Sequence, residues 1–114
     1  MKTETRFTPG PWNREDATVY TSAKDGGNRF QAQFTRGFGD DGKRIDNEEV
    51  VANAVLAQAA PDMYAALQDA REYVGEALSL RRAMFAGHEG TGSVSDIEAC
   101  IAQIDEALAK ADGR

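Results

Sequence analysis

Hydrophobic and polar residues alternate over residues 29–35, and this spacing predicts a strand with one buried face. Residues 17–22 are rich in β-forming types, and the segment 24–28 between the two runs holds a pair of glycines typical of a hairpin turn. Together these segments predict a β-hairpin. Two strands alone are marginally stable, so we expect a third strand near residues 12–14 or 43–45, or from a partner, to complete the sheet.

From Asp46 onward the apolar positions recur every three or four residues, which is typical of helices. Asp46 is expected to cap the first helix, with Glu49 three residues later as in a capping box. The helix should end near Ala60, because a proline disfavours the helical conformation of the residue before it. Pro61 then suits the first position of a second helix.

The second helix is long, and a run of glycines within residues 87–92 is expected to end it. A third helix should start at Ser95, with Glu98 completing a second capping box. The second and third helices each have an apolar stripe, so these two are expected to pack together as an antiparallel hairpin. Cys100 lies on the stripe of the third helix, where a small buried side chain is expected.

These elements predict an α+β fold with a small antiparallel sheet followed by three helices. We expect a single domain over residues 1–114, with a β region in 1–45 that includes a glycine-rich loop and a helical region in 46–114. Of the residues that make up the 41% hydrophobic fraction, 19 are alanines, which bury little area. The core should therefore be thin, and we expect a homo-oligomer that completes it. A monomer with close helix packing through alanine is the alternative.

The net charge of −6 is unevenly distributed. Residues 1–46 hold eight Lys/Arg and seven Asp/Glu, whereas residues 47–114 hold five and twelve. An acidic chain is poorly suited to bind DNA or RNA, because that affinity depends largely on Lys and Arg displacing counterions. The chain has no long apolar run and no secretory leader, so no membrane association is expected, and a single cysteine fits a cytoplasmic location.

Residues 37–44 read GFGDDGKR and satisfy two phosphate-binding glycine patterns. One is the G-x-G-x-x-G pattern of dinucleotide-binding folds, and the other is the G-x-x-x-x-G-K pattern of nucleoside triphosphatases. A nucleoside triphosphatase loop needs Ser or Thr where Arg44 stands, and the Asp40–Asp41 pair would repel phosphate. No βαβ unit surrounds the segment, so neither of these enzyme folds is expected. A flexible connecting loop is one interpretation.

A ligand loop is the other interpretation of this segment. Phe38 could stack on a base, and Arg36, Lys43 and Arg44 could pair with phosphate oxygens.

No group of residues predicts catalysis. His88 is the only histidine and has no second ligand at zinc-binding spacing, and the acidic residues around Asp46 do not match a calcium loop. We therefore expect no enzymatic activity, no cofactor and no metal.

Two segments resemble a family of small phage and prophage proteins. Residues 7–12, FTPGPW, resemble an opening near "HTPGPW", and residues 51–67, VANAVLAQAAPDMYAAL, resemble an "ANARLIAAAPDLLEAL" stretch. The resemblance covers roughly residues 7–70. The chain departs from it at Phe7, where the family often has His, and at Val55, where the family often has Arg.

The family is similar to phage anti-defence sponge proteins, which bind cyclic oligonucleotides or cyclic ADP-ribose isomers made by bacterial immune systems. The resemblance implies sequestration of such a ligand, without cleavage, in the cytoplasm of the host. Residue type and position in the chain add Asn53 and Arg71 to the ligand-binding candidates of the loop. The alternative is a protein-interaction module or phage assembly protein that binds a host or phage protein through its acidic helices.

Overall fold

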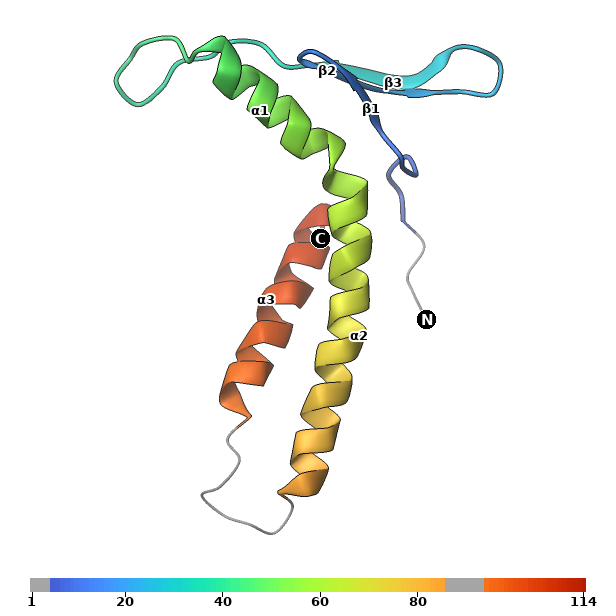
Figure 1. The fold of residues 1–114 in the computed structure, drawn as a ribbon, viewed down its shortest axis with the longest axis vertical. Helices are drawn as coiled ribbons and strands as arrows, with labels where there is room; N and C mark the ends of the chain where they lie inside the picture. Colours follow the sequence, from blue (N-terminus) through green and yellow to red (C-terminus); the bar gives the residue numbers. More distant parts are fainter. Residues whose placement is uncertain (1–4, 86–93) are drawn as a thin grey trace. The chain divides into compact units, whose positions relative to one another are not determined.

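The structure, a computed structural model, describes residues 5–85 and 94–114 (Figure 1). It divides into two compact units. The first, Phe7–Met63, is called the sheet unit here, and the second, which comprises Met1–Arg6 and Tyr64–Arg114, is called the helical unit. A three-stranded antiparallel sheet is followed by three helices, so the predicted α+β class is confirmed.

The sheet contains β1 (Asn13–Glu15), β2 (Thr18–Ser22) and β3 (Asn28–Gln33) in that order. The predicted hairpin of β2 and β3 is confirmed, with Val19 opposite Ala32. Of the two segments proposed for the third strand, the one before β2 supplies it. The other forms only a single bridge, between Phe38 and Arg44.

One face of the sheet packs against α1 (Asn47–Gln58). Val19 and Thr21 from β2 are buried there, as are Val50 and Ala54 from α1. The alternation along β2 and the four-residue spacing on α1 bring these side chains to the same interior. Beside them, Arg14 Nε donates a hydrogen bond to Gln58 Oε1 at 3.1 Å.

The predicted N-cap of α1 is confirmed, because Asp46 Oδ1 accepts a hydrogen bond from the Glu49 amide at 2.8 Å. Asp46 thus satisfies an amide that the first turn of α1 leaves without a partner.

Only Ala59 separates α1 from α2 (Ala60–Met84), which starts one residue before the expected position.

The Phe7–Trp12 segment is an irregular turn that bends at Phe7 and Gly10, and it is anchored through its tryptophan. The Trp12 and Phe30 rings meet edge to face with centroids 4.9 Å apart, and Trp12 Nε1 donates to the Thr8 carbonyl at 2.9 Å. These contacts fasten the turn to β3.

In the helical unit, α2 pairs with α3 (Ser95–Ala111) as the predicted antiparallel hairpin (Figure 1). Three side-chain hydrogen bonds fix the register. They join Tyr64 to Asp112, Arg71 to Asp105 and Arg82 to Glu98.

Two expectations for α3 are wrong. The helix starts at Ser95 as predicted, but the capping box does not form: the N-cap is Val94, which makes no side-chain capping bond, and the Glu98 carboxylate accepts from Arg82. Cys100 is exposed rather than buried, because α3 packs against a single helix that covers only a narrow face. The glycine run and His88 lie outside the described residues.

The core is thin, as expected. The buried apolar residues in the described part of the chain are few: Val19, Val50, Ala54, Tyr64 and Ile104. None of the described helices combines the length and apolar character needed to cross a bilayer.

Candidate functional site

The segment from Arg36 to Ile45, called the 36–45 loop here, connects β3 to α1. It is held by its own backbone hydrogen bonds. The Gly39 amide donates to the Lys43 carbonyl at 2.8 Å, and the Ile45 amide donates to the Gly37 carbonyl at 2.9 Å. These bonds make a miniature antiparallel ladder, so the loop has a defined geometry.

The ladder places Phe38 opposite Arg44. The two backbone bonds flank this pair rather than joining it, so it is a non-hydrogen-bonded pair. Such pairs bring side chains on the same face closest together, with Cα atoms about 4.5 Å apart. Phe38 is 73% exposed and Arg44 is exposed too, so both side chains leave the same face of the ladder with room for a ligand.

The other cations of the loop flank this pair. Arg36 Nε donates to the Ile45 carbonyl at 2.6 Å, which fixes the guanidinium while its two terminal nitrogens make no other bond within the described residues. Neither Lys43 nor Arg44 has an ion-pair partner among them. The loop therefore carries three cations and one exposed aromatic ring, with Arg44 on the same face as Phe38 and Lys43 on the opposite face.

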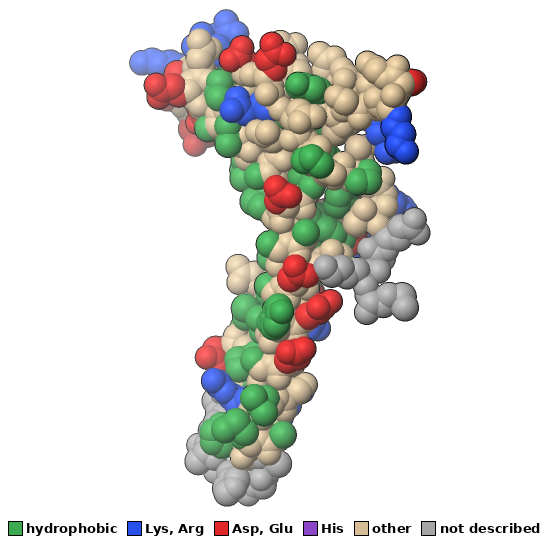
Figure 2. All heavy atoms as spheres, turned by 45° about the vertical axis from the view of Figure 1, so that its right-hand side comes forward, with side chains coloured by type: hydrophobic (Ala, Val, Ile, Leu, Met, Phe, Trp, Pro, Cys, Tyr) green, Lys and Arg blue, Asp and Glu red, His purple; other side chains and the backbone are tan. Residues whose placement is uncertain are grey.

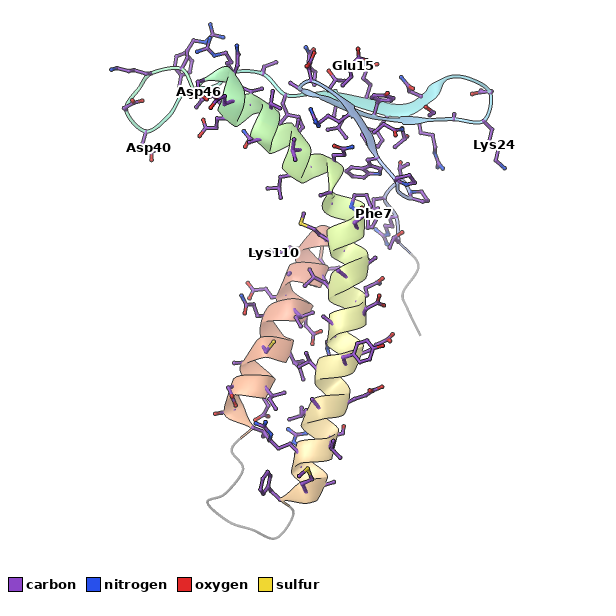
Figure 3. All side chains as sticks on the ribbon, in the orientation of Figure 1. Phe7, Glu15, Lys24, Asp40, Asp46 and Lys110 are labelled. Atoms are coloured by element: carbon purple, nitrogen blue, oxygen red, sulfur yellow. The ribbon has the colours of Figure 1, made fainter. Side chains whose placement is uncertain are left out.

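Acidic side chains lie at the tip of the loop and directly after it, as Figure 3 shows for Asp40 at the tip and Asp46 at the start of α1. Asp41 Oδ1 accepts from the Lys43 amide at 2.9 Å, and Asp46 Oδ1 caps α1. Two of the three carboxylates thus have a backbone role. The loop itself, with Arg36, Lys43 and Arg44 against Asp40 and Asp41, has one excess positive charge.

The remaining two candidates lie elsewhere. Asn53 is exposed on α1, seven residues beyond Asp46 and about 10 Å along the helix axis. Arg71 belongs to the helical unit, where its Nε donates to Asp105 Oδ1 at 2.8 Å. The structure therefore brings together four of the six candidates: Arg36, Phe38, Lys43 and Arg44.

The family model of Salmonella phage P22 protein Y8K6 matches residues 1–114. The chain belongs to this phage protein family. Comparison with curated proteins and with solved structures finds no match. The expectation that the chain belongs to a family of small phage proteins is confirmed, and the relationship to sponge proteins stays a prediction.

This Y8K6-family protein has a second polar surface that sequence reasoning did not single out, on the face of the sheet opposite α1. Two cross-strand rows occupy it, Asn13–Tyr20–Gln31 and Glu15–Thr18–Gln33. Most of these residues line a hollow of about 540 Å³. The alternation of residues 29–35 predicted that β3 has a polar face here. The sequence signal for a binding site on this face would have been Tyr20, which lies between the amide side chains of Asn13 and Gln31.

One titratable side chain of the helical unit has a perturbed pKa. The hydrogen bond of Tyr64 to Asp112, followed by burial, raises the pKa of its hydroxyl above the usual 10.0. This pair ties α2 to α3 and is remote in sequence from the loop. Within residues 5–85 and 94–114 no three potential metal ligands gather.

Proposed function

We propose that this phage protein binds a nucleotide-type anion on the 36–45 loop and sequesters it without cleavage. The observation that carries the proposal is the ladder pair of Phe38 and Arg44, which directs an exposed aromatic side chain and a guanidinium without an ion pair among the described residues to one face. A nucleobase stacks on an aromatic ring, and a guanidinium fork pairs with phosphate oxygens.

The loop supports phosphate binding in a second way. Arg36 is held by the Ile45 carbonyl, so less side-chain freedom is lost when its remaining nitrogens meet a phosphate. Lys43 lies next to Arg44 in the chain and points to the opposite face of the ladder. It adds positive potential there without competing with Arg44 for space. A ligand with two phosphates can therefore meet cations on more than one side of the loop.

The ligand class comes from the resemblance to sponge proteins, which implies a cyclic oligonucleotide or a cyclic ADP-ribose isomer used as an immune signal. Membership of a phage protein family is compatible with this class and does not select it. Because the loop residues are exposed, one protein loop covers one side of such a ring. The other side stays open to solvent or to a second protomer, and the ratio of ligand to protein distinguishes these arrangements.

The test is calorimetric titration of a ligand found to bind from these two classes, using paired variants. Arg44→Gln should weaken binding by about 1.5–3 kcal/mol, because a charge-assisted bond to phosphate is lost. Phe38→Ala should cost about 1–3 kcal/mol through lost stacking. Lys24→Gln removes the same charge from the turn between β2 and β3 and should leave the affinity unchanged.

Equal losses for Arg44→Gln and Lys24→Gln would mean that only net charge matters, and the loop would not be the site. Recovery of the ligand at an altered mass would replace sequestration with catalysis.

A second candidate function is binding of a basic protein surface through α1. Val55 and Leu56 are exposed on this helix, and Val55 lines a shallow hollow of about 550 Å³ with Glu48. An apolar strip bordered by carboxylates suits a partner with apolar residues framed by Lys or Arg. Val55→Lys should abolish a specific complex with such a partner, whereas Arg44→Gln should not affect it.

A further inference from the structure

Helix α2 has two apolar faces, and α3 covers only one of them. Tyr73, Leu80 and Met84 are 71%, 63% and 64% exposed, and Ala77 is exposed between them. At 100° per residue these four positions fall within a strip about 60° wide. Figure 2 shows hydrophobic side chains following the helical part of the chain, with acidic side chains along one flank.

The exposed strip lies away from α3. The residues of α2 that bond to α3 are Tyr64, Arg71 and Arg82, and they cluster on one side of the helix. By helical geometry the centre of that side is about 160° from the centre of the exposed strip. Nothing in the described helical unit therefore packs on Tyr73 and Leu80.

The strip follows a heptad pattern. Ala70, Ala77 and Met84 lie seven residues apart and take the a positions of a heptad, and Tyr73 and Leu80 take the d positions. This is the a and d spacing by which two helices pack side by side. These five residues are called the seam here. The alanines at a positions allow the helix backbones to approach closely, and the larger residues fill the space between.

Charges beside the seam select a partner and an orientation. Glu76 lies on one flank and Arg81 on the other, and neither has an ion-pair partner within the described residues. Five residues apart, they do not face each other on one helix. In a parallel pair of identical helices, residue g of one chain meets residue e of the next heptad in the other, which sets Glu76 against Arg81 of the second copy.

We propose that a second copy of this chain covers the strip, through a parallel, two-fold symmetric pairing of α2 helices along Ala70–Met84. The Glu76–Arg81 contact forms twice in that arrangement, once on each side of the seam. An antiparallel pairing would place each acidic flank against the same flank of the other copy and would leave Arg81 without Glu76. This inference does not depend on nucleotide binding at the 36–45 loop.

The first test is sedimentation equilibrium of the full chain over a wide concentration range. Leu80→Glu should raise the dimer dissociation constant by about tenfold or more, because a carboxylate would be buried in the seam. Leu56→Glu is the matched control, since Leu56 is 61% exposed on α1, and it should leave the constant unchanged. Circular dichroism establishes that both variants are folded.

A wild-type chain that stays monomeric at every concentration would overturn the proposal, and so would equal effects of the two leucine variants.

The second test concerns orientation and does not depend on Leu80. Glu76→Arg and Arg81→Glu should each weaken the dimer, and the double variant should recover most of the wild-type affinity. In a Cys100→Ser background, Tyr73→Cys should form a disulfide-linked dimer on mild oxidation, because equivalent d positions meet only in a parallel pair. Failure of both the charge swap and the cross-link would overturn the parallel arrangement.

Discussion

Replacing Thr21 by valine tests how the sheet unit is stabilised. Thr21 is 4% exposed in β2, and its hydroxyl oxygen is buried with no hydrogen-bond partner among the described residues. Valine has nearly the same shape and the same branching at Cβ. The substitution therefore changes the polarity of one buried group and little else.

The expected gain follows from the cost of that hydroxyl. An unsatisfied buried donor or acceptor costs about 1–3 kcal/mol in desolvation. The methyl group that replaces it is buried in the same place and adds to the hydrophobic contribution, and valine favours strands. We expect Thr21→Val to raise the free energy of unfolding by about 1–2 kcal/mol. Each kcal/mol corresponds to about 4–8 °C in Tm for a domain of about 60–100 residues.

The assay is urea denaturation followed by tryptophan fluorescence. Trp12 is the only tryptophan and contacts Phe30 in the sheet unit, so its signal reports on this unit. The midpoint should increase while the urea slope stays constant. Thr18→Val, on the opposite face of the same strand, is the control and should change stability by no more than about 0.5 kcal/mol.

An unchanged or lower midpoint for Thr21→Val would refute the reasoning. It would mean that the hydroxyl makes a compensating bond, such as one to a buried water. Equal gains for the two threonine variants would attribute the effect to strand propensity instead of buried polarity.

Three further predictions concern single contacts. Tyr64→Phe should cost about 0.5–1.5 kcal/mol at neutral pH, since Tyr64 donates to Asp112. Because the fold raises the pKa of Tyr64, the stabilisation by its hydroxyl is complete below pH 10.0 and is lost as the pH rises through the raised pKa. Melting curves across this pH range should show a weaker decline of stability in Tyr64→Phe than in the wild type, and an equal decline would contradict the prediction. Asp46→Ala should lower the urea midpoint by an amount equivalent to about 1 kcal/mol through loss of the cap of α1, and a wild-type midpoint would count against that role. Gly10→Ala should cost about 1–3 kcal/mol by fluorescence-detected unfolding, because a Cβ there would lie 2.9 Å from the Pro61 Cβ, and a neutral result would show that the turn adjusts freely.

Much of the fold could be predicted from the sequence because its signals are local. The cap of α1 depends on Asp46 and an amide three residues later, and the hairpin depends on alternation around a glycine turn. Such interactions form within a few residues and need no knowledge of tertiary packing.

The exposure of individual helix residues was harder to predict, because it depends on what packs against each face. Cys100 lies at the edge of the stripe on α3, and a second neighbouring helix would have buried it. Likewise, apolar residues surround much of α2, and periodicity alone did not separate the face toward α3 from the strip that holds Tyr73 and Leu80. Only the position of α3 distinguishes the two faces.

The candidate site was predictable by residue type but not by geometry. A glycine-rich loop with one aromatic residue and three cations indicated a ligand loop, whereas the pairing of Phe38 with Arg44 depends on the register of the ladder. Arg71 suited the same chemistry in the sequence, but the structure pairs it with Asp105 in the helical unit. Residue type alone could not distinguish a ligand contact from an ion pair between helices.

Ligand binding by the purified full chain is the central claim, and native mass spectrometry tests it most directly. The protein would be measured alone and with a panel of cyclic oligonucleotides and cyclic ADP-ribose isomers. We predict that one member adds its intact mass to the protein at a fixed ratio, and that Arg44→Gln diminishes the complex while Lys24→Gln does not. A protein that retains none of the panel, or binds a member equally well without Arg44, would contradict the account.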